Sequence, residues 1–275
     1  MDVSVIIINY NTRKMTSECI DSVIEHTSGI DYEIVLVDNA SKDGSKEFFE
    51  TDSRVKYIYS DRNAGFGAGN NLGAKYAKGK YLFLLNSDTL VNNNAIELFL
   101  DYAESHNQRC VYGGWLNDKE GKPNKSQFPF PRMGYCEFVK SFLVKPKKED
   151  RTHEMHVDAV VGADMFILKS VYDEAGGFDE NIFMYGEETE LEYRLKLMGV
   201  DRMIIPGPNI VHFGGASGTS TQSVSHMDSH YYFLKKHMPW YLYVSARLYY
   251  GLNFFLRWLM HPSEEALLKN AFMKI

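Results

Sequence analysis

The chain has 275 residues, 44% of them hydrophobic and 24% charged, which is the composition of an ordinary soluble globular protein. This composition excludes a collagen-like chain, a disulfide-stapled miniprotein and long-range disorder. The 30 basic and 36 acidic side chains give a net charge of −6. No overall positive field attracts nucleic acid, so we expect no nucleic-acid partner.

The three cysteines are too few and too scattered for a disulfide framework or a zinc site. The first residues also lack the positive segment and the long apolar segment of a signal peptide. We therefore expect the protein to fold and work in the cytoplasm.

The first 105 residues alternate between β-branched apolar runs and runs with helical spacing. We expect strands at residues 3–9, 33–37, 55–59 and 81–85, and helices at 16–26, 45–50, 65–78 and 94–105. Strands that alternate with helices predict an α/β fold in which helices flank a mostly parallel, Rossmann-like sheet.

The second half of the chain is less regular. We expect strands at 110–116 and 157–168, a helix at 187–198, and two short apolar segments at 203–205 and 210–212. Aromatic residues crowd the last third, which predicts an aromatic helical extension at the C-terminal end.

Polar clusters follow three of the predicted strands, at residues 9–12, 38–41 and 86–89. Each cluster taken by itself is most simply a turn, because Asn, Asp and Ser favour turns. In parallel sheets, however, ligands bind outside the carboxyl ends of the strands. Three polar clusters at the same sheet edge therefore predict a ligand site.

The segment from Gly65 to Asn70 is similar to a dinucleotide-binding fingerprint, but Asn70 replaces the third glycine and the segment follows the third strand. We therefore do not assign a nicotinamide or flavin cofactor. A glycine-rich turn into a helix can still accept the polar groups of a nucleotide. Asn63 and Asn70 are candidates for those contacts, with helix capping as the alternative for Asn63.

Several residues have the chemistry of a metal site or a general base. Asp88 follows a strand end, where a carboxylate suits Mg²⁺ bound to phosphates. His212 ends an apolar run before two glycines, and neutral imidazole is a competent metal ligand. The acidic run 187–192 could supply a general base, in a pocket walled by the flanking Phe178, Phe183, Met184 and Tyr185. Its alternative role is to stabilise the start of a helix, where Glu190 and Arg194 would also form an i,i+4 pair.

These segments, taken together, carry a resemblance to a known family. They are VSVIIINYN, EIVLVDNASKDGS, RNAGFGAGNNLG, YLFLLNSDT, VVGADMFILKSVYDEAGGFDENIFMYGEETELEYRLKLMG and VHFGGAS. In this order the chain resembles the inverting family 2 glycosyltransferases with a GT-A fold, in particular their rhamnosyltransferase-like branch. The resemblance implies a catalytic domain at residues 1–217 and a C-terminal extension at 218–275.

The resemblance also implies roles for individual residues. Glu188 would be the catalytic base, with Glu187 and Glu190 in support, and Asp88 and His212 would hold a divalent cation, Mg²⁺ or Mn²⁺. Trp115 and Asp164 would contact the acceptor or the sugar. The nucleotide sugar would meet Asn9, Asn11, Asp38, Asn63, Gly65, Asn70, Asn86 and Ser87.

The sequence departs from the family pattern at three of these positions. Asn86 stands where the metal motif can have its first Asp, and Glu188 and Glu190 stand where the family commonly has Asp. The donor implied first is dTDP-L-rhamnose, with a UDP-hexose as the alternative, and the acceptor is a glycan or a lipid-linked glycan. A nucleotide-sugar pyrophosphorylase and a catalytically inactive glycan- or partner-binding homologue remain alternative functions.

Residues 239–260 form an apolar, aromatic run of about 22 residues. Arg247 and Arg257 argue against a membrane span, because two arginines near a bilayer centre are costly. Tryptophan and tyrosine favour the membrane interface, and Lys235 and Lys236 could meet anionic headgroups. We expect either peripheral contact with the inner face of the plasma membrane or packing against the catalytic domain or a second subunit, as in a homodimer.

Overall fold

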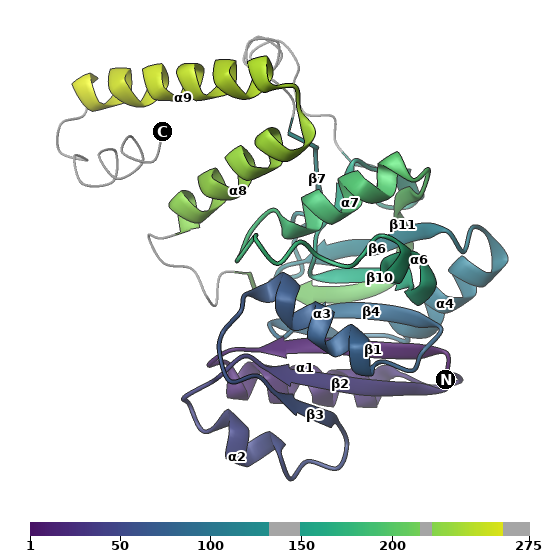
Figure 1. Ribbon diagram of the computed structural model, residues 1–275. Helices are drawn as coiled ribbons and strands as arrows, with labels where there is room; N and C mark the ends of the chain where they lie inside the picture. The colour runs from purple at the N-terminus through teal and green to yellow at the C-terminus, as the bar shows by residue number, and fades with distance from the viewer. Residues whose placement is uncertain (132–148, 215–221, 261–275) are drawn as a thin grey trace. The chain divides into compact units, whose positions relative to one another are not determined.

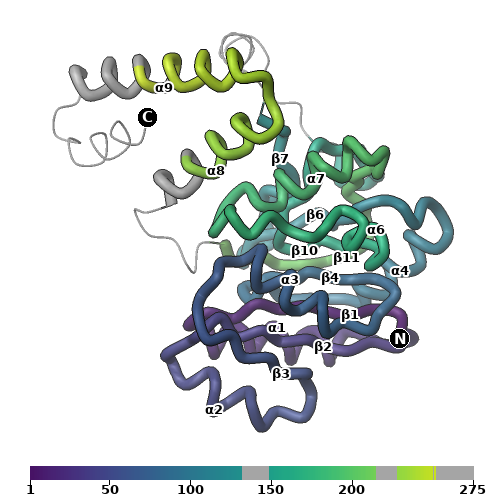
Figure 2. The backbone as a smooth tube through the Cα atoms, in the orientation of Figure 1, coloured from purple at the N-terminus to yellow at the C-terminus, as the bar shows by residue number. Residues whose placement is uncertain are grey.

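The computed structural model describes residues 1–131, 149–214 and 222–260. The chain divides into two compact units. The first comprises residues 1–130 and 150–218, and the second comprises residues 131–149 and 219–275. Figure 1 labels most of the helices and strands, and Figure 2 traces the same backbone.

The first half of the chain forms the parallel part of a nine-stranded sheet. Its strands are β1 (Val3–Asn9), β2 (Tyr32–Asp38), β3 (Lys56–Tyr59) and β4 (Tyr81–Asn86), joined by helices α1 (Arg13–His26), α2 (Ser45–Phe49) and α3 (Phe66–Tyr76). They lie side by side in the order β3-β2-β1-β4 and all run in parallel. The predicted α/β fold is confirmed here, and each predicted strand agrees with the observed one to within one residue at either end.

The second half continues the sheet in mixed directions. Strand β10 (Asp164–Leu168) runs antiparallel between β4 and β6 (Cys110–Asn117). Beyond β6 lie β11 (Asp201–His212), which is parallel to it, and the edge strand β5 (Thr89–Val91). The short strand β8 (Met155–His156) pairs with β11, whereas β7 (Gln127–Phe128) and β9 (Ala159–Val160) form a separate two-stranded sheet.

Two expectations for this half of the chain are wrong. Residues 157–168 are not one strand, because the chain leaves β9 and crosses residues 161–163 before it enters β10. The apolar segments at 203–205 and 210–212 belong to a single strand, β11, whose register shifts between Ile205 and Ile210 around the intervening Pro-Gly-Pro. A bulge of this kind keeps one strand continuous while it absorbs residues that cannot pair.

Helices cover both faces of the sheet (Figure 1). On one face α1 and α4 (Ala95–Ser105) pack through side chains such as Ile20 and Phe99. On the other face α3, α6 (Lys169–Glu174) and α7 (Glu187–Leu197) pack through side chains such as Tyr172 and Leu191. Helix α3 lies so close to β1 that a Cβ atom at Gly73 would stand only 2.6 Å from Cγ2 of Ile6, and glycine makes this approach possible.

The direction of β10 determines what meets at the edge of the sheet. The carboxyl ends of β1, β2 and β4 lie at one edge. Because β10 is antiparallel to β4, its first residue lies at this same edge, with Asp164 opposite Leu85. Residues 161–163 therefore reach the edge where the polar clusters were predicted. There the backbone amide of Asn86 donates a hydrogen bond of 3.0 Å to the Ala163 carbonyl.

The second unit contains two helices, α8 (Gln222–His237) and α9 (Trp240–Met260). Arg247 of α9 lies 5.7 Å from the ring centroids of Tyr231 and Tyr243, and it donates a hydrogen bond of 2.9 Å to the Tyr243 hydroxyl. In the described part of the chain, no helix combines the length and the apolar character needed to cross a membrane.

Candidate active site

Side-chain hydrogen bonds join the three polar loops at the carboxyl edge of the sheet. The Asn9 amide donates to Ser41 Oγ at 3.0 Å. Its Oδ1 accepts from the hydroxyl groups of Thr12 and Thr16 at 3.0 and 2.9 Å. The Thr12 hydroxyl also lies 3.3 Å from that of Ser87. The loops after β1, β2 and β4 thus form one connected surface.

Asn11 and Asp38 shape this surface from neighbouring positions. Asn11 has a φ of 56°, and its Oδ1 accepts a hydrogen bond of 2.7 Å from the Lys42 amide. Asp38 is fully buried; its carboxylate accepts from the Ser41 amide at 2.8 Å and from the Tyr57 hydroxyl at 3.0 Å. Both side chains fix loop geometry, and their predicted contact with a nucleotide stays a prediction.

The glycine-rich turn before α3 touches the segment before α7. Gly65 has a φ of 93°, and a Cβ atom there would collide with the Phe183 carbonyl oxygen. Asn63 Oδ1 accepts a hydrogen bond of 3.0 Å from the Gly65 amide, so Asn63 stabilises the turn. Asn70 is buried and donates to the Phe66 carbonyl at 3.0 Å, while its Oδ1 has no partner.

A cavity of about 220 Å³ opens beside this edge. It brings together four of the predicted site residues, namely Asn86, Glu187, Glu188 and His212. The rest of its lining consists of Phe66, Phe128, Val161, Gly162, Ala163, Met184 and Tyr185. Carboxyl groups from the start of α7 thus share one small space with polar groups from the ends of β4 and β11.

The two glutamates in the cavity differ in their surroundings. Glu187 is 5% exposed and its Oε2 has no partner; burial, with the nearby charge of Glu188, raises the pKa of Glu187 well above its ordinary value. Burial also raises the pKa of Glu188. However, Glu188 Oε2 accepts a hydrogen bond of 3.1 Å from the Gly186 amide, which stabilises its carboxylate form. Glu188 is therefore better suited than Glu187 to accept a proton.

Asp88 and His212 form the candidate metal site. His212 Nε2 lies 3.3 Å from Asp88 Oδ1, and the two side chains are 16% and 14% exposed. Asn86 Nδ2 lies 3.5 Å from the same ring nitrogen, while Asn86 Oδ1 is buried without a partner. Within the described ranges, no group of three or more His, Cys, Asp or Glu side chains could hold a metal. The donors present do fit a cation that takes its remaining ligands from phosphate and water.

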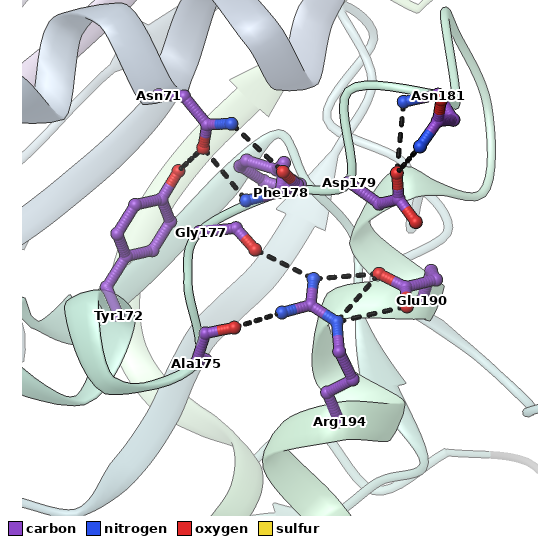
Figure 3. Close-up of polar contacts among 9 residues, drawn as sticks. All are labelled: Asn71, Tyr172, Ala175, Gly177, Phe178, Asp179, Asn181, Glu190 and Arg194. Carbon is purple, nitrogen blue, oxygen red and sulfur yellow. Dashed lines mark hydrogen bonds and ion pairs between the residues drawn. The ribbon is translucent and has the colours of Figure 1, made fainter.

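Glu190 lies in a different environment, although it belongs to the same acidic run (Figure 3). It is fully buried and forms an ion pair of 2.7 Å with Arg194. Arg194 also donates to the carbonyl groups of Ala175 and Gly177. Glu190 is not one of the described residues that line the cavity. Its contacts hold the 175–177 turn to α7, and its predicted support of catalysis stays a prediction.

Trp115 and Asp164 also lie outside the set of described residues that line the cavity. Trp115 is 5% exposed, and the Arg151 guanidinium lies 5.1 Å from the centroid of its ring. Asp164 is fully buried and accepts a hydrogen bond of 2.7 Å from the Gly114 amide; burial raises the pKa of Asp164 well above its ordinary value. The predicted contact of these residues with acceptor or sugar stays a prediction.

Two residues at or beside the cavity, Phe128 and Glu192, were not predicted as site residues from the sequence, whereas Tyr185 was. Phe128 lines it from a segment that the sequence marks merely as turn-rich. Met184 and Tyr185 line it as the sequence predicted, and Tyr185 has a φ of 67°, a strained conformation for an aromatic residue. Glu192 is buried, accepts a hydrogen bond of 3.0 Å from the Val160 amide and has a pKa raised well above its ordinary value by burial. Its spacing of four residues from Glu188 is a signal that sequence analysis could have used.

Solved structures share the fold of this chain. The crystal structure of GalNAc-T7 with UDP, GalNAc and Mn²⁺ matches 83% of this chain and 47% of its own, with a TM-score of 0.61 and 20% identity. The crystal structure of S. aureus TarS matches 86% of this chain and 39% of its own, with a TM-score of 0.60 and 15% identity. The expected GT-A fold is confirmed.

Residues 4–174 match the family model described as Glycosyl transferase family 2, and the chain belongs to that family. It is 31% identical to the low-salt glycan biosynthesis hexosyltransferase Agl10 of Haloferax volcanii, over 71% of this chain and 62% of the relative. It is 27% identical to the rhamnosyltransferase WbbL of Escherichia coli K12, over 66% of this chain and 73% of the relative. A third relative, the glycosyltransferase GlyG of Streptococcus pneumoniae, is 32% identical over a match that spans 44% of this chain and 42% of the relative.

The contacts of Glu190 predict that its replacement destabilises the fold. Glu190→Gln leaves the Arg194 guanidinium without its carboxylate partner, and breaking a buried ion pair costs about 3–5 kcal/mol. Urea unfolding should show this loss, whereas Glu188→Gln on the same helix should unfold close to the wild-type midpoint. Equal stability of the two variants would contradict the structural role of Glu190.

Proposed function

We propose that this chain transfers a sugar from a nucleoside diphosphate donor to an acceptor hydroxyl group, with inversion at the anomeric carbon. Its membership of family 2 supports transfer as the reaction. The observation that carries the proposal is the cavity, which joins the carboxyl groups of Glu187 and Glu188 to the polar side chains of Asn86 and His212. A base and a site for a leaving diphosphate are the two elements that direct inversion requires.

Glu188 is the proposed catalytic base. Its carboxylate accepts the proton of the acceptor hydroxyl group. The acceptor oxygen forms a bond to the anomeric carbon on the face opposite the nucleotide, while the bond from that carbon to the diphosphate oxygen breaks. The electron pair of that bond leaves with the nucleoside diphosphate. No sugar–enzyme bond forms, so Glu188 needs no nucleophilic partner.

Asp88 and His212 are the proposed ligands of a divalent cation, Mg²⁺ or Mn²⁺. Support comes from their separation of 3.3 Å and from the unpartnered Asn86 Oδ1 beside them. The solved structure of GalNAc-T7 contains Mn²⁺ with UDP. A cation bound here would neutralise negative charge on the departing diphosphate.

The nucleotide side of the donor is proposed to bind along the carboxyl edge of the sheet. This surface is formed by the loops that Asn9 joins and by the turn into α3. The residues assigned to it are Asn9, Asn11, Asp38, Asn63, Gly65, Asn70, Asn86 and Ser87. Several of their polar groups stabilise the loops themselves, so their proposed role is to shape the site as well as to contact the ligand.

The proposed donor is dTDP-L-rhamnose, with a UDP-hexose as the alternative. WbbL is named a rhamnosyltransferase, which favours the first, and Agl10 is named a hexosyltransferase. The proposed acceptor is a growing glycan, lipid-linked in the simplest case. Nucleotide release from a panel of nucleotide sugars, with and without acceptor, would separate these donors from a catalytically inactive homologue.

Residues 218–275 are proposed as an extension of the 1–217 catalytic domain that contacts the inner face of the plasma membrane. Trp240, Val244 and Leu248 of α9 are 76%, 42% and 70% exposed, and their four-residue spacing places them on one side of the helix. Lys235 and Lys236 are exposed near the end of α8. Apolar and basic side chains in this arrangement suit an anionic membrane surface.

Replacement of the proposed base should abolish most of the activity without weakening donor binding. Glu188→Gln should lower kcat by about 10²–10⁴-fold, because a general base contributes on that scale. Since burial raises the pKa of Glu188, wild-type activity should rise with pH through a midpoint above the ordinary glutamate value of about 4.3. The measurements are steady-state transfer across pH and donor affinity by calorimetry. Exposed Glu120→Gln is the control, and normal transfer by Glu188→Gln would exclude Glu188 as the base.

Removal of the cation should stop transfer. Asp88→Ala should nearly abolish product formation, and EDTA should suppress the wild-type reaction until Mg²⁺ or Mn²⁺ is restored. Asp101→Ala, at an exposed position in α4 that is not among the described residues lining the cavity, is the control. Full activity in metal-depleted buffer would contradict the proposed cation.

Liposome binding should depend on the exposed side of α9. The double variant Trp240→Ala, Leu248→Ala should co-sediment less with anionic vesicles than the wild type does, and wild-type binding should weaken as salt rises. Phe48→Ala, which removes an exposed aromatic ring from the first unit, should have no effect. Absence of wild-type binding together with a dimer in solution would identify α9 as a subunit contact instead.

A further inference from the structure

The segment 124–128 is fixed to the wall of the cavity. The Asn124 amide donates to the His212 carbonyl at 3.0 Å. The Ser126 hydroxyl accepts from the Leu116 amide at 2.8 Å, and its carbonyl accepts from the Val161 amide at 3.0 Å. Phe128 then lines the cavity itself. The backbone on both sides of Lys125 is therefore anchored to strands and to cavity residues.

The Lys125 side chain turns back over one of these wall residues. Its Nζ lies 3.8 Å from the centroid of the Phe128 ring, which is a close cation–π contact. Lys125 is exposed as a residue, but partial burial of its ammonium group lowers its pKa, while the negative charge of Glu188 acts in the opposite direction. Because Phe128 and Glu188 line the same cavity, the ammonium group lies against a wall of the cavity that holds the proposed base.

Glu188 has several other ionisable neighbours. Glu187 and Glu192 belong to the same helix, and His212 lies across the cavity with Asp88 behind it. Glu187 and Glu192 are buried acids that would repel the carboxylate of Glu188 if they ionised. A positive charge from the 124–128 segment opposes both this repulsion and the cost of burial.

We propose that Lys125 is a positioning residue for the base, whose ammonium group, held against the Phe128 ring, keeps the Glu188 carboxylate charged. This inference rests on the proposed function, because it assigns Lys125 a role in the same transfer reaction. Lys125 acts through Glu188 and needs no contact with the substrate. Its effect should therefore appear in the pH dependence of the reaction.

The sign of the effect follows from the charge. Loss of the ammonium group raises the pKa of Glu188, so a higher pH is needed to ionise the base. The acidic limb of kcat/KM should move upward by about 0.5–1 pH unit in Lys125→Met. On that limb activity falls by about 3- to 10-fold, and well above it the variant and the wild type should converge. Lys125→Arg keeps the charge and should restore the wild-type limb.

The control is Lys122→Met, which removes a second exposed lysine from the same turn-rich segment, one that is not among the charges acting on Glu188. Its pH profile should match that of the wild type. An unshifted limb in Lys125→Met would overturn the proposal. An unshifted limb with a raised KM for the acceptor would show instead that Lys125 binds substrate.

A second measurement needs no turnover. The Glu188 carboxyl carbon, labelled with ¹³C and assigned by its absence from Glu188→Gln, can be titrated by NMR in the wild type and in Lys125→Met. A higher midpoint in Lys125→Met supports the proposal, and an identical midpoint rejects it. If the wild type transfers no sugar but the Glu188 midpoint is still higher in Lys125→Met than in the wild type, the proposed function is refuted. The electrostatic role of Lys125 then stands.

Discussion

The hydrogen bonds of the Asn9 side-chain amide hold together the carboxyl edge of the sheet, on which the candidate site depends. Asn9 lies at the end of β1 with no exposed surface, and each of its polar atoms has a partner in a loop or helix nearby. A buried amide is costly to leave unpaired, so these hydrogen bonds constrain the loops far more than exposed ones would. The loops after β1 and β2 are therefore held in one relative position before any ligand arrives.

The parallel half of the fold could be predicted because its signals are local. Each strand from β1 to β4 is a continuous apolar run, and the helices between them show regular spacing. The antiparallel insertion of β10 could not be predicted in this way. The apolar composition of its residues predicts a strand buried on both faces. It does not predict which strands lie beside β10 or in which direction β10 runs.

The site shows the same division between local and distant information. The carboxyl ends of β1, β2 and β4 meet as predicted, since parallel strands bring those ends to a common edge. The helix α7 was harder to interpret. Glu188 and Glu190 belong to the same acidic run in the sequence. In the structure, however, Glu188 lines the cavity, whereas Glu190 pairs with Arg194. The difference depends on the 175–177 turn, whose carbonyl groups hold Arg194, and that turn reaches α7 only in the folded chain.

The antiparallel direction of β10 gives the cavity one wall that is paired with the sheet and one that is not. Residues 161–163 are held at both ends by backbone hydrogen bonds, since the Asn86 amide donates to the Ala163 carbonyl and the Val161 amide donates to the Ser126 carbonyl. Met184 and Tyr185 lie on the other side, in a connection between α6 and α7 that has no strand of its own. Substitutions at these two side chains change the space for a sugar without breaking a strand pairing. Diversification of sugar choice among relatives with this framework should thus begin in the short stretch before α7.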